Sequence, residues 1–123
     1  MIDESIRIYI VPLFNILMTS AFLKLECNTV RNRIWNFLIV HSEFDYSMKD
    51  IANYSEVSYT AFKEIWKDFV KRDIVKYKRN VGKAKLYILN RENHQVEKFI
   101  DYYWSVVHQE VEKHRQHEEL LVH

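Results

Sequence analysis

Between Ser47 and Asn90 the apolar residues change their spacing from a helical period to a strand period. Over residues 58–72 they recur every three or four positions, which predicts an amphipathic helix. From residue 75 to residue 88 apolar and polar residues alternate, as they do in half-buried strands. Gly82, the only glycine, lies between the two alternating runs, where a hairpin loop needs a positive φ. The stretch therefore predicts a helix followed by a β-hairpin.

Two serines mark where helices begin in this stretch. Ser47, with Asp50 three residues on, fits a capping box, so a helix is expected from about Met48. Ser58 is the second candidate N-cap. The apolar stripe that follows it consists of Phe62, Ile65, Trp66, Phe69 and Val70. The opposite face of that helix carries Tyr59, Thr60, Lys63, Glu64, Lys67 and Lys71.

Alternation also predicts which side chains of the hairpin face inward. The inward set is Val75, Tyr77, Ala84, Leu86 and Ile88. The outward set is Lys76, Lys78, Lys83, Lys85 and Tyr87. The loop is expected to be the three residues 80–82. Arg79, Lys83 and Lys85 would then give the hairpin a cationic tip.

Further helices are predicted on both sides of this stretch. Thr29 fits the N-cap of a helix with Ile34, Trp35, Phe37 and Leu38 inside and Arg31 and Arg33 outside. Asn93 fits the N-cap of a last helix that reaches about Glu118, roughly 37 Å in length, with apolar positions Val96, Phe99, Ile100, Tyr103, Val107 and Val111. Pro12 fits the first turn of a helix that ends near Leu25. The alternation over residues 6–11 leaves a strand open there.

Composition places the chain in a class. One glycine and one proline in 123 residues leave little room for linkers and favour helices. One mainly helical domain with a small hairpin (α+β) is expected. The single cysteine excludes an internal disulfide and fits a reducing compartment, so a cytoplasmic location is expected. The apolar residues 6–25 contain Arg7, Asn15 and the Thr19-Ser20 pair, so no membrane role is expected.

The formal net charge of +1 hides an uneven distribution. Residues 1–62 hold five Lys/Arg and seven Asp/Glu, residues 63–91 hold ten and three, and residues 92–123 hold three and seven. The balances are therefore −2, +7 and −4. A +7 block on the second predicted helix and the hairpin favours a DNA-facing surface. The alternative is an ordinary solvated face.

Ile51-Ala52 and Val57-Ser58, with the helix that follows them, resemble the I-A-x-x-x-G-V-S-x-x-T signature of winged helix-turn-helix DNA-binding domains. The later IVKYKRNVGKAKLYILN resembles their wing, and residues 13–107 as a whole look like archaeal regulators of the MarR and ArsR kind. Glu56 and Asp73 stand where these proteins prefer glycine, and Ala61 stands where threonine is common. A left-handed non-glycine residue costs on the order of 1 kcal/mol, so either Glu56 bears that strain or the turn is rearranged.

The resemblance implies a homodimeric transcriptional regulator that binds double-stranded DNA sequence-specifically. The helix after Ser58 would enter the major groove, and the wing would contact phosphates or a minor groove. The candidate DNA-binding residues are Ser58, Tyr59, Thr60, Lys63, Lys67, Arg79, Lys83 and Lys85. Residues 43–46 would form the short strand that pairs with the wing in this fold.

Residues 1–27 and 92–123 are expected to form the dimer interface around a core of residues 28–91. The reason is that the last helix overhangs a small domain and has a broad apolar face. The candidate interface residues are Leu13, Leu17, Phe99, Tyr103, Val107 and Val111. Alternatively, the two terminal helices pair within one chain.

No enzyme, cofactor or metal site is expected. The polar residues form no nucleophile arrangement, and one glycine cannot build a phosphate loop. Glu110, His114, His117 and Glu118 share a helix face and are suitable zinc or nickel ligands, but so polar a run is typical of a solvated helix end. Two other functions stay open: a protein-binding winged helix and an initiator of plasmid or viral replication.

Overall fold

The computed structural model describes residues 21–122, so Leu13 and Leu17 lie outside the described residues. Residues 21–26 are helical and precede the helices α2 (Val30–Val40), α3 (Met48–Tyr54), α4 (Tyr59–Lys71) and α5 (His94–Val122). The strands are β1 (Tyr46–Ser47), β2 (Val75–Val81) and β3 (Ala84–Leu89). The mainly helical class with a small hairpin is confirmed. Among the described helices, none has both the length and the apolar character needed to cross a membrane.

The helices begin at the predicted caps. In each case a side-chain oxygen accepts a hydrogen bond from a backbone N–H two or three residues later, which satisfies a donor that the first turn leaves free. The pairs are Thr29 with Asn32 (3.1 Å), Ser47 with Asp50 (3.2 Å), Ser58 with Ala61 (3.2 Å) and Asn93 with Gln95 (2.9 Å). At its other end α5 is longer than expected, with 29 residues that span about 43 Å.

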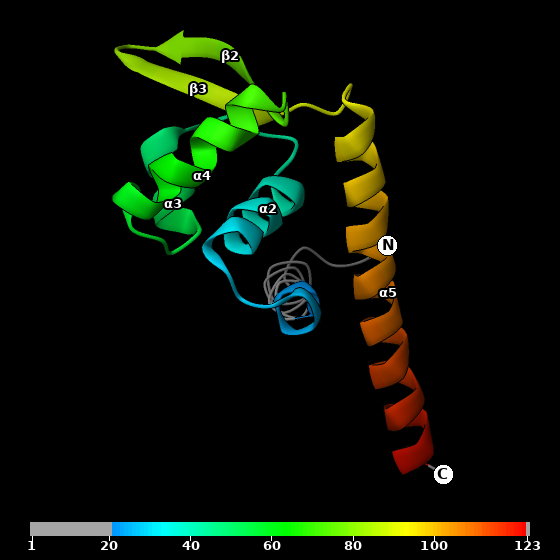
Figure 1. The fold of residues 1–123 in the computed structure, drawn as a ribbon. Coiled ribbons are helices and arrows are strands. Elements are labelled where there is room, and N and C mark those ends of the chain that lie inside the picture. Colours follow the sequence, from blue (N-terminus) through cyan, green and yellow to red (C-terminus); the bar gives the residue numbers. More distant parts are fainter. Residues whose placement is uncertain (1–20, 123) are drawn as a thin grey trace.

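The core surrounds α2, in which residues 34–39 are all buried. The indole of Trp35 stacks on Phe99 of α5 at 4.1 Å between ring centroids and also contacts Phe69 of α4 at 5.1 Å. Figure 1 shows α5 running beside α2 and extending beyond the group of α2, α3 and α4. The predicted stripe of α4 is buried at Phe62, Trp66 and Phe69. Val70 is 47% exposed, so its predicted inward position is wrong.

The helical residues 21–26 pack on α5 within the same chain. Phe22 is fully buried, and its ring centroid lies 5.8 Å from that of Phe99 and 4.9 Å from that of Tyr103. The Tyr103 hydroxyl, also buried, donates to Asn36 Oδ1 of α2 at 2.7 Å. The first half of α5 is therefore part of the core of a single chain.

The sheet is antiparallel in the order β1-β3-β2. The strand predicted at residues 43–46 lies at Tyr46–Ser47, and it pairs with β3, as the resemblance implied. The predicted three-residue loop is wrong, because Val81 pairs with Ala84 and leaves only Gly82 and Lys83 between them. Gly82 has φ +61° and Lys83 has no positive φ. This is the pattern of a type II′ turn, whose backbone twist matches that of the strands.

The predicted faces of β3 are also wrong. Leu89 is buried and the ring of Tyr87 contacts Trp66 of α4 edge-on at 5.4 Å, so these two side chains face the helices. Lys85 shares their face because side chains alternate along a strand. Leu86 and Ile88, expected inside, lie on the other face. In β2, Lys78 is an extra residue at a bulge between Tyr77 and Arg79, which reverses the alternation beyond it.

Candidate nucleic-acid interface

The exposed face of α4 presents the side chains predicted for it. Tyr59, Thr60, Lys63 and Lys67 are all exposed, while Ser58 caps the helix. The Lys63 ammonium lies 4.9 Å from the centroid of the Tyr59 ring, a cation–π contact that holds the two side chains together. Residues 59–67 of α4 therefore carry an aromatic ring, a hydroxyl and two ammonium groups toward solvent.

Lys67 has a partner on its own helix. Its ammonium lies 3.3 Å from Glu64 Oε1, and the two side chains are 75% and 73% exposed. An exposed pair of this kind contributes little free energy, so a phosphate can replace the carboxylate at small cost.

A groove of about 430 Å³ lies between the starts of α3 and α4 and the hairpin. It is lined by Ser47, Met48, Lys49, Tyr59, Lys83, Ala84, Lys85 and Tyr87. Three of these residues are lysines and none is acidic. Within the described part of the chain, none of the three lysines forms an ion pair. The groove is therefore cationic and lies beside the exposed face of α4.

The predicted site residues did not include Lys49. It lies in the first turn of α3, where the helix dipole disfavours a cation. An unfavourable position of this kind is the sequence signal that could have pointed to it. Lys85 was predicted on the solvent face of the hairpin, and it reaches the groove because the phase of β3 is the reverse of the prediction.

Arg79 does not join the groove. Its Nε and Nη2 atoms donate to Asp45 Oδ2 and Oδ1 at 2.6 and 3.1 Å, across β3. The bulge at Lys78 is the reason, because it turns Arg79 to the face of the hairpin opposite Lys85. The guanidinium holds the pKa of the Asp45 carboxyl below its usual value. Arg79 thus ties the hairpin to the segment before β1.

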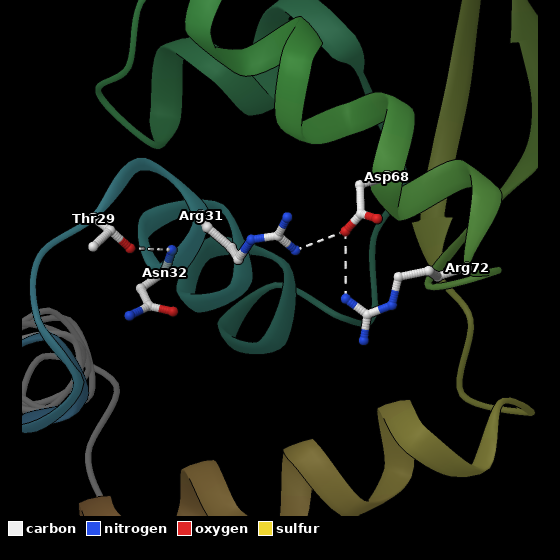
Figure 2. Close-up of polar contacts among 5 residues, drawn as sticks. All are labelled: Thr29, Arg31, Asn32, Asp68 and Arg72. Atoms are coloured by element: carbon white, nitrogen blue, oxygen red, sulfur yellow. Dashed lines mark hydrogen bonds and ion pairs between the residues drawn. The ribbon is translucent and has the colours of Figure 1, made fainter.

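A second charged group, centred on Asp68, attaches α4 to α2. Asp68 Oδ2 accepts from Arg31 of α2 at 2.8 Å and from Arg72 at 3.3 Å (Figure 2). The hydrogen bond from Arg31, followed by that from Arg72, lowers the pKa of the Asp68 carboxyl. The second half of α4 is thereby attached to α2.

The predicted dimer residues of α5 lie largely inside one chain. Tyr103 and Val107 are 0% and 1% exposed, and Phe99 and Val111 are half-buried against the core. Exposed apolar surface nearby comes from other residues, Leu25 at 61% and Tyr102 at 44%. Farther along α5, His114 lies 3.5 Å from Glu110. Among the described residues, no three His, Cys, Asp or Glu side chains come close enough to hold a metal ion.

Comparison with known proteins gives a match in structure. No protein-family model matches the sequence, and no curated protein matches it. Over 99% of this chain and 95% of the other, the structure is similar to MepR, a transcription regulator of the Staphylococcus aureus multidrug efflux pump MepA, with a TM-score of 0.56 and 12% sequence identity. A variant of S. aureus MepR bound to an oligodeoxyribonucleotide matches over the same shares of the two chains, with a TM-score of 0.54 and 11% identity.

A MarR-family transcriptional regulator from Silicibacter pomeroyi is also similar. It matches over 93% of this chain and 79% of its own, with a TM-score of 0.53 and 11% identity. The helix order, the three-stranded sheet and the position of the long last helix agree with the resemblance found in the sequence. The chain therefore has the winged helix-turn-helix fold of MarR-type transcription regulators, with α3 and α4 as the helix-turn-helix and β2–β3 as the wing.

Proposed function

We propose that this chain is a sequence-specific double-stranded DNA-binding protein that acts as a homodimeric transcriptional regulator. The observation that carries the proposal is the acid-free groove that holds Lys49, Lys83 and Lys85 beside the exposed face of α4. Within the described residues these three ammonium groups form no ion pair, and they lie next to a helix with exposed polar side chains. This arrangement suits a phosphate backbone and a major groove. The oligodeoxyribonucleotide bound to the MepR variant supports the same use of this fold.

The side chains would divide the work between base and phosphate contacts. Tyr59, Thr60 and Lys63 lie on the first turns of α4, the part of a recognition helix that reaches base edges. Ser58 and Lys67 lie at the ends of that face and suit phosphates. The lysines of the groove would hold one strand where it passes between α4 and the wing. Arg79 would orient the wing through Asp45.

We propose that two copies associate through their terminal segments, residues 1–27 and 92–123, around winged-helix cores of residues 28–91. The second half of α5 extends past the core of its own chain, which supports this division (Figure 1). Leu25→Lys is a suitable test, since Leu25 is 61% exposed and contributes little to its own fold. Sedimentation should show a dimer for the parent chain and a folded monomer for the variant. A variant that remains a dimer would exclude Leu25 from the interface.

A mobility-shift titration tests the DNA-binding proposal. The full chain is titrated against the duplex upstream of its own gene and against a scrambled duplex, at about 50 and 200 mM salt. Specific binding should be tighter than binding to the scrambled duplex, and both should weaken at high salt. Binding that is absent from both duplexes would favour a protein-binding winged helix.

Two variants test the role of α4. Thr60→Ala and Lys63→Ala should each weaken binding to the specific duplex about tenfold, the typical effect of losing a base contact. Lys98→Ala is the control, because Lys98 is exposed on α5 and does not line the groove. Equal affinities for all three variants would remove α4 from the recognition role. A role in DNA binding would also fit a non-catalytic, cytoplasmic protein.

A further inference from the structure

The turn between α3 and α4 holds a residue in a conformation that favours glycine. Glu56 has φ +59°. Its N–H donates to the Asn53 carbonyl at 3.1 Å and the next N–H, that of Val57, donates to the Ala52 carbonyl at 3.1 Å. These two bonds define a Schellman motif, in which the left-handed position is usually glycine. The turn is thus kept, and Glu56 bears the backbone strain.

A side chain from α2 holds the other side of this turn. Arg33 Nη1 donates to the Glu56 carbonyl oxygen at 2.8 Å, while its Nε donates to Asn28 Oδ1 at 2.6 Å. The Glu56 carbonyl and the Val57 N–H belong to one planar peptide unit. This unit is therefore held at both ends, by Arg33 on its oxygen and by the Ala52 carbonyl on its nitrogen.

The orientation of the peptide between Glu56 and Val57 sets the direction in which α4 begins. Ser58, the N-cap of α4, follows Val57 directly, so a rotation of the peptide would redirect the first turn of the helix. That turn carries Tyr59 and Thr60, which lie in the proposed DNA interface. We infer that Arg33 is a positioning residue for DNA recognition, which holds the strained turn at Glu56 and thereby aims α4. The inference rests on the proposed function for its DNA readout.

Arg31 supplies a matched control. It lies two residues earlier on α2, but its partner is Asp68 in the second half of α4 and not the turn before that helix. Arg31→Met and Arg33→Met therefore remove the same chemical group from the same helix. Only the second change releases the Glu56 peptide.

Glu56→Gly should rescue the loss of Arg33, because glycine adopts the left-handed conformation without strain. On the specific duplex, Arg33→Met should weaken binding about tenfold through loss of a charged hydrogen bond to the turn. Arg33→Met/Glu56→Gly should bind within about twofold of Glu56→Gly alone. Arg31→Met should gain nothing from Glu56→Gly.

The salt dependence separates this role from a direct phosphate contact. A positioning residue leaves the slope of log affinity against log salt unchanged, whereas a lost phosphate contact lowers it by about 0.9. A lower slope for Arg33→Met on both duplexes, without rescue by Glu56→Gly, would overturn the inference. An unchanged affinity of Arg33→Met for the specific duplex would overturn it as well.

Amide hydrogen exchange at Val57 gives a readout that needs no DNA. Exchange should be faster in Arg33→Met than in the parent chain, return to the rate of Glu56→Gly in the double variant, and stay at the parent rate in Arg31→Met. If the parent chain binds no DNA, the proposed function fails while the Val57 rates still decide whether Arg33 holds the turn. Equal exchange at Val57 in the parent chain and in Arg33→Met would overturn the inference.

Discussion

The turns at the two ends of α4 use the same backbone motif but are anchored by different means. Asp73, like Glu56, is left-handed, with φ +55°, and its turn has the same pair of hydrogen bonds, Asp73 N to the Val70 carbonyl and Ile74 N to the Phe69 carbonyl. In both turns the carbonyl of the left-handed residue accepts from a distant side chain. A non-glycine residue is thus tolerated where a third group fixes the peptide that follows it.

The anchors differ in charge and in origin. The Asp73 carbonyl accepts from two neutral amides, those of Asn90 and Asn93, each at 3.0 Å. Both lie between the end of the wing and the start of α5. The Glu56 carbonyl accepts from the charged Arg33, which precedes the turn in the chain. The second turn is therefore coupled to the wing and α5, and the first to α2 and the loop before it.

Among the variants that test this comparison, Asn93→Ala should have the largest effect on stability. The Asn93 amide donates to the carbonyls of Arg72 and Asp73, and its oxygen caps α5. Losing all three bonds should lower the free energy of unfolding by about 2–3 kcal/mol, as measured by urea denaturation. Asn53→Ala is the control, since Asn53 is exposed on α3 and its side chain has no hydrogen bond among the described residues. A loss no larger than that of the control would show that Asn90 alone holds the turn.

Replacing the left-handed residues by glycine should raise stability at both turns. Glu56→Gly should raise the free energy of unfolding by about 1 kcal/mol, because the strain of a left-handed residue is removed. Asp73→Gly should gain less, since Asp adopts this conformation more readily than Glu. Urea denaturation of both variants against the parent chain measures the difference. A loss of stability at either position would mean that the side chain contributes more than its backbone strain costs.

The wing begins two residues after the second turn, and its cations should separate into two groups. Lys85→Ala should lower the slope of log affinity against log salt by about 0.9, because Lys85 lies in the groove, forms no ion pair among the described residues and would contact a phosphate. Arg79→Ala should leave that slope unchanged, since Asp45 already neutralises the guanidinium. Binding isotherms at several salt concentrations provide the measurement. A slope that falls for Arg79→Ala but not for Lys85→Ala would reverse the assignment.

The smallest effect on stability is expected at Asp68, whose charge lies on α4 between the two turns. Asp68 has a folded-state pKa below its usual value, so its ion pairs stabilise the fold above the unfolded-state pKa of about 4 and are lost as the pH falls through the folded value. Asp68→Asn should therefore lower the melting temperature slightly at pH 7 and reduce the loss of stability as the pH falls below about 4. Thermal unfolding across that range checks this. An unchanged acid profile would mean that exposure to solvent cancels the pairs.

The sequence by itself determined the helix starts and the order of the elements. Thr29, Ser47, Ser58 and Asn93 cap helices because each hydrogen bond joins residues two or three positions apart, so the signal is local. The change from helical to alternating spacing located the hairpin in the same way. At Glu56 the resemblance to a short motif left two outcomes open, a strained left-handed residue or a rearranged turn, and the structure has the first.

Tertiary structure alone decided which faces of these elements meet. A bulge at Lys78 and the packing of Tyr87 on Trp66 set the phase of the wing, which brought Lys85 into the groove and moved Arg79 to Asp45, 34 positions away. The hydrogen bond of Tyr103 to Asn36 joins residues 67 apart and takes an expected interface residue into the core. Such contacts depend on how distant elements pack, because the apolar period of one helix or strand shows that a face is buried but not what covers it.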